Sequence, residues 1–335
     1  IGLQVKLKRL DKTFNWGIIG TGGIANAFAN DLKYLDDHHV IAVASRTKNN
    51  ATKFSSNFDN CIGYDNYEEF LHNPTIDGVY IATPNNLHLE HTLLALNAGK
   101  PVLCEKPFAL NENEVKAMIL AAKENNVLLI EAMWTRFLPH IKAVKTIIEN
   151  GDLGKIQTVK ADHGQNLTQI KNPRLWNREY GGGALLDLGI YVVSFAHLIL
   201  GTPCKIIANS TFSKDRIDLQ TSAIFHYDTG AQAVLNTTMI NSTPCRAIIS
   251  GDRGRLEINP IFYTPSSFRV IFNDGKRKNY IFQYQGHGLR EQAKEFARCV
   301  KVGLIESPLN SHNESLAVMK LMDQIRKKVG LKFNN

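Results

Sequence analysis

A glycine-rich turn between an apolar strand and a helix restricts the fold of this chain more than any other feature. An apolar segment, Phe14–Gly20, leads into Gly20-Thr-Gly-Gly-Ile-Ala25, and a helical pattern continues to about Leu35. The first glycine permits a tight turn, the second lets the backbone approach a pyrophosphate, and a small third residue lets helix and strand pack closely. Because a second apolar strand, His39–Ala44, follows, the pattern predicts a dinucleotide-binding unit rather than a structural turn. The contacts expected here are Gly20, Thr21, Gly22, Gly23 and Ile24.

The end of the second strand indicates which dinucleotide binds. In NAD-binding units an Asp or Glu at this point accepts hydrogen bonds from the ribose 2′-hydroxyl. This chain has Ser45-Arg46-Thr47-Lys48 there, without a carboxylate. A guanidinium pairs well with a 2′-phosphate, so Ser45 and Arg46 predict a preference for NADP. The alternative is that Arg46 stacks on adenine and that NAD binds as well.

Strands and helices alternate through the first 135 residues. Strands are expected at Gly78–Thr83, Pro101–Cys104 and Val127–Glu131, and helices at Ala51–Phe58, Tyr67–Leu71, Asn86–Ala98 and Asn111–Asn125. This alternation predicts an α/β fold with a doubly wound parallel sheet. Right-handed crossovers then bring the strand ends to one edge, where ligands bind. The further cofactor contacts expected along that edge are Thr83, Asn86, His88, Glu105 and Lys106.

The segment Val102–Pro107 places a lysine at the carboxyl end of a buried strand. Pro107 stops strand pairing because it has no N–H to donate. A lysine at such a position is costly unless it has a partner or a task. The alternative is that its stem extends along the surface and its ammonium reaches water. With a dinucleotide expected at the same edge, we expect Lys106 to face the nicotinamide.

Two histidines, His88 and His91, lie three residues apart on an expected helix, a spacing that could suit a metal ion. No third ligand accompanies them, and the pattern H-E-x-x-H is absent. We therefore expect no metal site. The expectation is that His88 lies near the cofactor and that His91 lies on the helix surface.

After about residue 135 the pattern changes to short strands that follow one another. Turn signals such as Asp228-Thr-Gly230 and Asn273-Asp-Gly275 separate several of them, which predicts an open, mainly antiparallel sheet in an α+β domain. The expected strands are Lys155–His163, Lys205–Phe212, Ser222–Tyr227, Gln232–Ile240, Arg246–Ser250, Arg255–Asn259, Phe268–Phe272 and Asn279–Tyr284, with closing helices near Leu289–Val302 and Glu314–Val329. We expect two domains, residues 14–135 and 136–335, with the last helix able to pack back on the first domain.

One expected helix, Ala184–Leu200, is apolar nearly all round and should be buried. Asp187 and Tyr191 are four residues apart and should share a face of it. The functional interpretation is that both point into the site that Lys106 enters; the alternative is a buried Asp–Tyr hydrogen bond, because a buried carboxylate needs a partner. Residues expected to line a substrate pocket are Trp134, Arg136, His163 and Trp176, with Asn166 and Arg174 as further candidates.

Charge and cysteine content narrow the class of protein. The net charge is +8, but the 39 Lys and Arg residues are dispersed and no basic stripe with interleaved aromatic residues stands out, so nucleic acid is not an expected partner. Five scattered cysteines favour reduced thiols and a cytoplasmic location. No apolar run approaches the roughly 20 residues of a membrane helix. The alternating apolar and basic segment Ile1–Thr13 lacks the apolar block of a signal peptide.

Four motifs together resemble the glucose-fructose oxidoreductase, inositol dehydrogenase and MocA family. They are the turn Gly20–Ala25, Ala82-Thr-Pro-Asn85 with His88, Glu105-Lys-Pro107 and Gly181-Gly-Gly-Ala-Leu-Leu-Asp187. Most of the wider family has His where this chain has Tyr191. That departure, with Glu131-Ala-Met-Trp-Thr-Arg-Phe137, resembles the dimeric dihydrodiol dehydrogenase and NADP-dependent D-xylose 1-dehydrogenase branch.

The resemblance implies an oxidoreductase acting on CH–OH groups. It implies reversible hydride transfer between a nicotinamide and a hydroxyl-bearing carbon of a sugar or cyclic trans-diol. Tyr191 would be the general base; a free tyrosine has a pKa of about 10, so the Lys106 ammonium would have to stabilise its phenolate. Asp187 would orient substrate hydroxyls or hold Lys106. It also implies a homodimer formed through the C-terminal sheet. The alternatives are a reductase of another substrate, such as a keto-sugar or a tetrapyrrole, and a non-enzymatic NADP-binding regulator.

Overall fold

The computed structural model describes residues 13–332, which form two compact units. The first unit contains the chain up to Ala109, residues 113–134 and Gly286–Ser315. The second contains Leu110–Glu112, Thr135–Gln285 and the chain from Leu316 onward. The prediction that no signal peptide is present concerns residues 1–13. Of these, only Thr13 is among the described residues.

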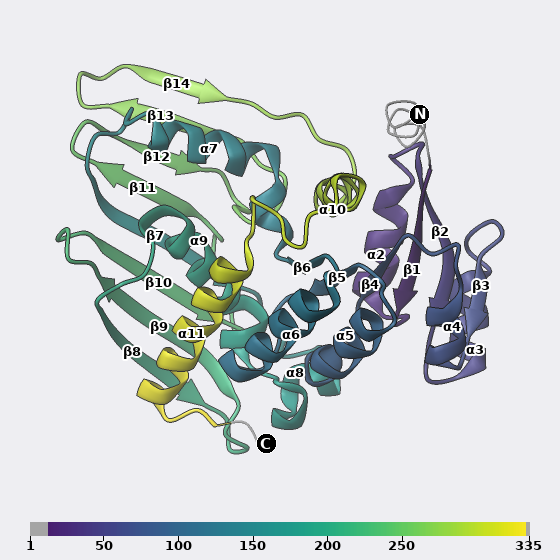
Figure 1. Cartoon of the computed structure of the whole chain (residues 1–335). Coiled ribbons are helices and arrows are strands. Elements are labelled where there is room, and N and C mark those ends of the chain that lie inside the picture. Colours follow the sequence, from purple (N-terminus) through teal and green to yellow (C-terminus); the bar gives the residue numbers. More distant parts are fainter. Residues whose placement is uncertain (1–12, 333–335) are drawn as a thin grey trace. The chain divides into compact units, whose positions relative to one another are not determined.

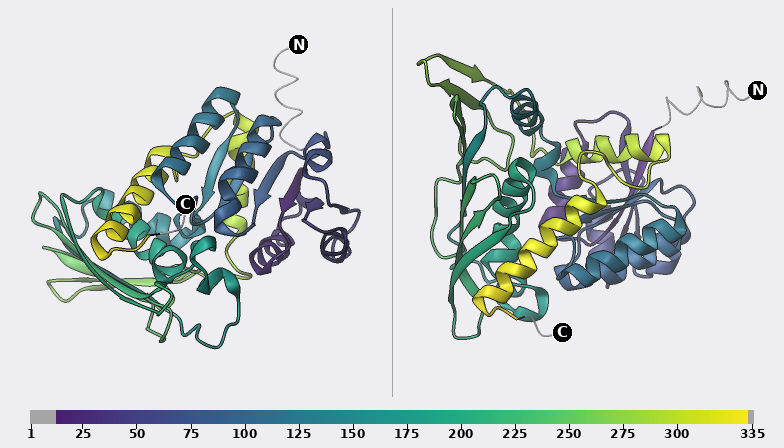
Figure 2. Two further views of the ribbon diagram at one scale, coloured as in Figure 1. Left: turned by 90° about the horizontal axis from the view of Figure 1, so that it is seen from below. Right: turned by 60° about the vertical axis from the view of Figure 1, so that its left-hand side comes forward.

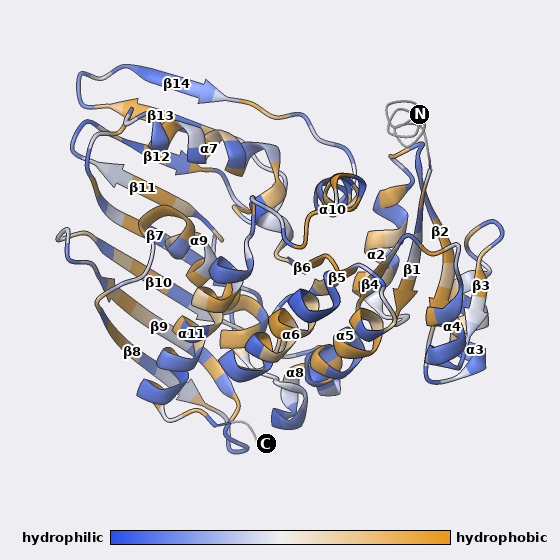
Figure 3. Cartoon of the chain, viewed as in Figure 1, coloured by the Kyte–Doolittle hydropathy of each residue, from blue (hydrophilic) through white to orange (hydrophobic). Residues whose placement is uncertain are grey.

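The first unit is built on a parallel sheet of six strands in the order β3-β2-β1-β4-β5-β6 (Figure 1). The strands are β1 (Phe14–Ile19), β2 (His38–Ala44), β3 (Ile62–Tyr64), β4 (Gly78–Ile81), β5 (Val102–Glu105) and β6 (Leu129–Ala132). The helices are α2 (Gly23–Leu32), α3 (Lys48–Ser55), α4 (Tyr67–His72), α5 (His88–Asn97), α6 (Glu112–Asn125) and α10 (Arg290–Val302), and a 3-10 turn, η1 (Asn85–Leu87), precedes α5. The predicted doubly wound sheet is confirmed, with its central strands largely apolar (Figure 3).

Large apolar side chains hold this unit together. Trp16 of β1 packs against Phe28 of α2 and Phe296 of α10, with ring centroids about 5 Å apart in both pairs. All three side chains are fully buried. The start of α10 is fixed by Asp31, whose carboxylate accepts backbone N–H groups of His287, Gly288 and Arg290. Burial of this kind contributes about 1.5–3 kcal/mol for each large apolar side chain.

The position of α10 differs from the expected division into domains. The segment that returns to the first unit is Gly286–Ser315, which carries α10, whereas the last helix belongs to the second unit from Leu316 onward. The physical reason is the contact of Phe296 with the aromatic core and the cap from Asp31, neither of which has a local sequence signal. Strand β3 was also missed, because its three residues, Ile62–Tyr64, are exposed or half-buried and carry too little apolar pattern.

The second unit contains an eight-stranded sheet in the order β14-β13-β12-β11-β7-β10-β9-β8. The strands are β7 (Ile156–Gly164), β8 (Lys205–Phe212), β9 (Asp218–His226), β10 (Gln232–Thr238), β11 (Ala247–Gly251), β12 (Gly254–Ile258), β13 (Phe268–Phe272) and β14 (Arg277–Tyr280). Neighbours run antiparallel except β7 and β10, which pair in parallel. The predicted open, mainly antiparallel sheet is confirmed.

Helices of the second unit gather on one face of that sheet (Figure 2, right). They are α7 (Pro139–Glu149), α8 (Pro173–Trp176), a π-helical segment η4 (Leu185–Gly189), α9 (Ile190–Leu200) and α11 (His312–Val329), with 3-10 turns η2 (Trp134–Phe137) and η3 (Arg178–Tyr180). Helix α7 was not predicted, although Pro139 at its first turn and buried Ile141, Val144 and Ile147 at helical spacing provide the usual signals.

The predicted apolar helix forms, but its first turns are π-helical. It starts at Ala184, passes through η4 and continues as α9, and its residues from Leu185 to Ala196 are buried. One stretch, Arg178–Leu200, is long and apolar enough to cross a membrane by length and composition, yet 78% of its most apolar window is buried. It packs against β7 and β10 inside the second unit, as a core helix does.

Candidate functional site

The glycine turn has the geometry that a bound pyrophosphate requires. Gly20 has φ +110, and a Cβ there would lie 2.6 Å from the carbonyl oxygen of Ala82, so only glycine fits between the ends of β1 and β4. A Cβ on Gly22 or Gly23 would meet nothing within 4 Å. Gly22 is the N-cap of α2 and makes no side-chain cap bond. The first N–H groups of α2 are therefore open to phosphate oxygens.

Two amides beyond β4 add to this fit. Asn85 is 3% exposed, and its amide nitrogen is buried without a hydrogen-bond partner within residues 13–332. The side-chain oxygen of Asn86 is likewise buried and unpartnered in that part of the chain. Unpaired buried polar atoms are costly, and they favour a ligand that pairs with them. The sequence had pointed to Asn86; the deeper Asn85 was not among the expected contacts, although it belongs to the Ala82–Asn85 motif.

The end of β2 carries Ser45 and Arg46 at the same edge. Ser45 is buried and Arg46 is exposed. The rings of Tyr67 and His91 lie 4.9 Å apart, and the positive charge of Arg46 acts on both side chains. Burial raises the pKa of Tyr67, and the positive charge of Arg46 opposes that rise. An exposed guanidinium at this edge suits either a 2′-phosphate or an adenine, so both expectations for Arg46 remain compatible with the geometry.

Lys106 follows directly after β5 and is half-buried. Its backbone N–H donates to the carboxylate of the preceding Glu105 at 3.2 Å. Glu105 is buried and also accepts a hydrogen bond from the hydroxyl of Tyr80 on β4, whose ring stacks on Phe28. Glu105 thus ties the ends of β4 and β5 together beneath Lys106. Its carboxylate is engaged inside the unit, and the cofactor contact expected of Glu105 stays a prediction.

Both histidines of α5 are buried, so the expectation that His91 lies on the surface is wrong. His91 is 3% exposed and its Nδ1 lies 3.1 Å from the Thr83 hydroxyl. His88 is fully buried between two carbonyls, with Nδ1 2.9 Å from that of Pro107 and Nε2 2.9 Å from that of Thr83. Burial lowers the pKa of His88 to about 4, so the ring is neutral and donates to one of the two. His88 joins the Thr83 loop to the loop that carries Lys106.

In the second unit, Asp187 has a partner that the sequence did not assign to it. Arg174 Nη1 lies 2.9 Å from Asp187 Oδ1, and the side chain of Asp187 is 12% exposed. A carboxylate this buried is stabilised by such a charge-assisted bond. The prediction that Asp187 and Tyr191 share a face assumed the spacing of an α-helix. The segment η4 is π-helical, so the turn between these two residues is wider than an α-helical turn.

Tyr191 lies in a cluster of aromatic rings. Its ring centroid is 5.1 Å from that of His163 and 4.8 Å from that of Tyr263, and His163 stacks on Tyr263 at 4.0 Å. Gln165 Nε2 lies 2.9 Å from both the Tyr263 hydroxyl and His163 Nε2. Burial raises the pKa of Tyr263, which keeps its hydroxyl protonated. Tyr263 and Gln165 were missed, because they are distant from Tyr191 in sequence and have no motif of their own.

Three further expected pocket residues have partners within their own units. Trp134 is buried in the first unit with its ring 5.2 Å from that of His287. Arg136 is buried in the second unit, where Nε donates to the Ser194 hydroxyl at 3.0 Å and so braces α9 one turn after Tyr191. Trp176 donates its indole N–H to the Ile170 carbonyl on an exposed segment. His163, by contrast, lies against Tyr191.

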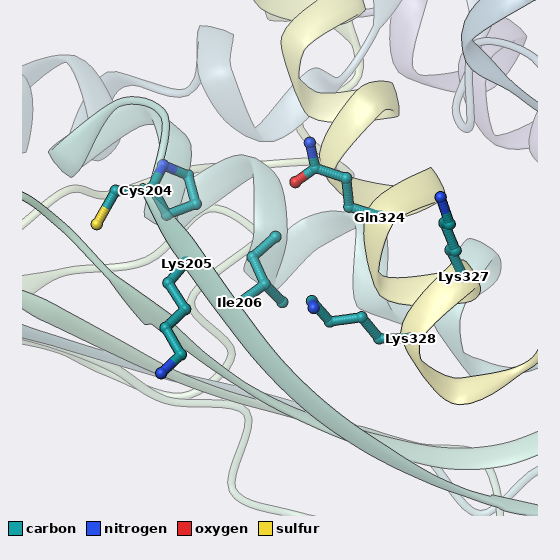
Figure 4. Close-up of a pocket in the computed structure, with 7 residues that line it drawn as sticks. Cys204, Lys205, Ile206, Gln324, Lys327 and Lys328 are labelled. Carbon is teal, nitrogen blue, oxygen red and sulfur yellow. The ribbon is translucent and has the colours of Figure 1, made fainter.

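A cavity of about 550 Å³ occurs elsewhere in the second unit (Figure 4). It lies between the start of β8 and the end of α11. Its lining residues are Pro203, Cys204, Lys205, Ile206, Gln324, Lys327 and Lys328. None of the expected site residues is among them. Two of its lysines belong to the last turn of α11, where cations stabilise the helix dipole without any ligand.

Two protein-family models match different parts of this chain. Residues 14–133 match the oxidoreductase family with an NAD-binding Rossmann fold, and residues 141–257 match the GFO/IDH/MocA C-terminal domain. The chain belongs to the Gfo/Idh/MocA oxidoreductase family. The resemblance drawn from the motifs is therefore confirmed, as is the expectation of an NAD(P)-dependent oxidoreductase.

Relatives cover almost the whole chain. The trans-1,2-dihydrobenzene-1,2-diol dehydrogenase of Mus musculus is 34% identical over 331 residues, which are 95% of this chain and 97% of that protein. The enzyme of the same name from Danio rerio is also 34% identical, over 95% and 98%. Among solved structures, the aldose-aldose oxidoreductase from Caulobacter crescentus has a TM-score of 0.86 at 25% identity. A 3-ketoreductase from Actinomadura kijaniata in complex with NADP and TDP-benzene has a TM-score of 0.83 at 27% identity. Both alignments cover 95% of this chain and 98% of the other.

Proposed function

We propose that this protein transfers hydride reversibly between NADP and a hydroxyl-bearing carbon of a sugar or a cyclic trans-diol. One observation carries the proposal. This chain combines a glycine turn that is open to a pyrophosphate with the three polar groups that hydride transfer to and from a hydroxyl-bearing carbon needs. Those groups are Lys106, Asp187 and Tyr191. The 34% identity to dihydrodiol dehydrogenases over nearly the full length of both chains supports the substrate class.

The turn at Gly20, the amide of Asn85 and the end of β2 would hold the cofactor. The bound nicotinamide supplies or accepts the hydride. Tyr191 takes the proton from the substrate hydroxyl during oxidation and returns it during reduction. The Lys106 ammonium favours the phenolate form of Tyr191 and stabilises the developing alkoxide. Asp187, held by Arg174, orients substrate hydroxyls.

The roles of Lys106 and Tyr191 are tested by their effects on turnover and binding. Tyr191→Phe should lower kcat by about 10²–10⁴-fold, the range for loss of a general base, with cofactor affinity unchanged. Lys106→Met should lower both kcat and cofactor affinity. If the two groups act on one substrate, the double variant should lose much less than the product of the single losses. A Tyr191→Phe enzyme with unchanged kcat would exclude Tyr191 as the base.

The preference for NADP rests on Arg46 and on the absence of a carboxylate at the end of β2. Arg46→Ala should weaken NADP binding by at least tenfold and leave NAD binding within about threefold, since only NADP carries the 2′-phosphate. Exposed Lys53, on the surface of α3, provides a control of equal charge, Lys53→Ala. Equal loss of both cofactors would favour the stacking role of Arg46 instead.

A second candidate function is reduction of a keto-sugar. The observation that favours it is the likeness to a solved 3-ketoreductase over 95% of this chain. A screen of NADP- and NAD-linked oxidation of aldoses, inositols and cyclic diols, run beside reduction of keto-sugars, separates the two. Tight NADP binding without turnover in either direction would favour a regulatory protein.

We also propose that a second copy of the chain covers the outer face of the eight-stranded sheet. A row of aliphatic side chains crosses three strands in register there: Ile207 pairs with Ile224, which pairs with Val234. They are 37–49% exposed. Ile224→Glu should convert a dimer into a monomer in sedimentation velocity, and Leu120→Glu, at an exposed site on α6, should not. A wild-type chain that sediments as a monomer at micromolar concentration contradicts this part.

A further inference from the structure

We propose that Asp218 is a positioning residue for the reaction, because its buried carboxylate fixes the start of the helix that carries Asp187 and Tyr191. Asp218 is the first residue of β9, distant in sequence from every motif that identified the site. The inference rests on the proposed function, since it assigns a task to Asp187 and Tyr191. It adds that the charge state of a third carboxyl group controls where those two lie.

The contact is made at the first turn of the helix. The backbone N–H of Leu185 donates to Asp218 Oδ2 at 2.6 Å in a fully buried setting. This N–H is one of the first in the helix and has no partner within it. Asp218 therefore acts as an N-terminal cap supplied by a strand rather than by the residue before the helix. A carboxylate at a helix N-terminus also interacts favourably with the helix dipole.

Gly183 shows how closely the carboxylate is fitted. Its φ is +125, and a Cβ there would lie 2.0 Å from Asp218 Oδ1. The space that a side chain would occupy is thus filled by the carboxylate. The last glycine of Gly181–Gly183, one of the family motifs, is explained by this contact and not by the approach of a ligand.

The cap is two residues from one functional group and six from the other. The N–H of Asp187 donates to the Gly183 carbonyl at 3.3 Å, so the residue packed against Asp218 also starts the turn that holds Asp187. Thr237 of β10 donates to the Ala184 carbonyl at 3.3 Å on the other side. The π-helical segment Leu185–Gly189 then leads into Tyr191. A shift of this first turn changes the placement of both Asp187 and Tyr191.

The carboxyl group changes its charge near neutral pH. Burial raises the pKa of Asp218 from 3.8 to about 7, although the bond from Leu185 and the charge of Arg326 oppose the rise. Oδ1 is buried and has no hydrogen-bond partner within residues 13–332. Proton uptake weakens the cap, because a neutral carboxyl is a poorer acceptor than a carboxylate.

Among the described residues, the charged group that shifts the pKa of Asp218 is Arg326 of α11, which is paired with Asp323. On the capped helix, the charged residue nearest in sequence to Leu185 is Asp187, which is paired with Arg174. Strands β8 and β10, which flank β9, contribute the hydroxyl groups of Ser210, which bonds Thr221, and Thr237. The remaining contact of the carboxylate is Thr221, at 3.5 Å from Oδ2.

The test compares Asp218→Asn and Asp218→Ala with a matched cap in the first unit. The amide oxygen of Asn keeps an acceptor for Leu185 but carries no charge, whereas Ala removes the cap. Asp31→Asn is the control, because Asp31 is a buried carboxylate that caps α10, a helix without site residues. For each variant, kcat and KM are measured from pH 5 to 9, with cofactor affinity measured separately.

We expect Asp218→Ala to lower kcat at least tenfold with cofactor affinity unchanged. Asp218→Asn, which keeps the acceptor without the charge, should show at every pH the intermediate kcat that wild type has below its inflection. The wild-type profile of kcat/KM should have an inflection near pH 7 that Asp218→Asn lacks and Asp31→Asn keeps. Identical pH profiles for wild type and Asp218→Asn, or kcat in Asp218→Ala equal to wild type, overturn the proposal.

A measurement that does not depend on turnover distinguishes a failure of this proposal from a failure of the proposed function. Amide hydrogen exchange of the 183–191 peptide should be faster in Asp218→Ala than in wild type, with peptides of the first unit unchanged. Faster exchange together with no turnover in wild type means that the proposed function fails and the cap stands. Equal exchange in the two proteins means that Asp218 does not hold the helix start.

Discussion

Two substitutions in the glycine turn separate its structural task from its binding task. At Gly20 an added methyl group meets the Ala82 carbonyl oxygen at 2.6 Å, about 0.8 Å short of ordinary contact, and φ is +110. At Gly22 an added methyl group meets nothing within 4 Å and φ is −77. Gly20→Ala should therefore damage the fold, and Gly22→Ala should damage only cofactor binding.

The expected magnitudes follow from these contacts. For Gly20→Ala, a residue held in a sparsely populated conformation costs about 1–3 kcal/mol and overpacking against backbone about 1–3 more. A loss of that size lowers the Tm of a unit of this length by roughly 5–15 °C. For Gly22→Ala, exchange of Gly for Ala at an N-cap costs about 0.5–1 kcal/mol, which is less than the loss expected at Gly20. A methyl group where the pyrophosphate approaches should weaken cofactor binding by about 10–100-fold, which is roughly 1.4–2.8 kcal/mol.

Thermal unfolding and cofactor titration distinguish the two outcomes. Because a ligand that binds only the folded state raises Tm, added NADP identifies the transition of the first unit. Nicotinamide fluorescence then gives the affinity of each variant. The reasoning is refuted if Gly20→Ala unfolds at the wild-type temperature, or if Gly22→Ala binds NADP as tightly as wild type does.

Other changes have outcomes set by burial. Phe296→Ala should lower the free energy of unfolding of the first unit by about 3–5 kcal/mol in a denaturant titration, because it opens a cavity beside Trp16. Burial lowers the pKa of His38 and of His88 to about 4. As the pH falls, these histidines are therefore protonated in the unfolded chain before they are protonated in the folded one. The free energy of unfolding should be full above pH 6.5 and decrease towards pH 4, which urea unfolding midpoints measure. For Asp218 the pKa is raised, so wild type loses stability as pH rises from about 4 to about 7. Asp218→Asn should not, and should gain on the order of 3 kcal/mol over wild type across that window.

Much of the candidate site could be proposed from the sequence because its residues lie in short segments with recognisable patterns. The turn Gly20–Ala25, the lysine after β5 and the Asp187–Tyr191 spacing each combine a residue type with a local element. The parallel, doubly wound character of the first sheet followed from the alternation of strands and helices. Strand boundaries were within a few residues for the same reason, since apolar periodicity is a local property.

Partners from distant segments could not be predicted. Arg174 on Asp187, Tyr263 on Tyr191 and Tyr80 on Glu105 have no fixed spacing in the sequence. The sequence predicted His91 on the surface, because a helix pattern does not tell which neighbouring segment covers the polar face of the helix. Its burial follows from the contact of α5 with Tyr67 and Thr83.

The sequence by itself determined the two kinds of sheet, the dinucleotide turn and the candidate residues of the proposed reaction, because each depends on periodicity or on a few adjacent residues. Only the tertiary structure decided that α10 returns to the first unit, that β7 and β10 pair in parallel and that Asp218 caps the helix of Tyr191. These features depend on which segments meet after the chain has collapsed. That choice is made by burial and by pairing of polar groups across the whole unit, and no local pattern encodes it.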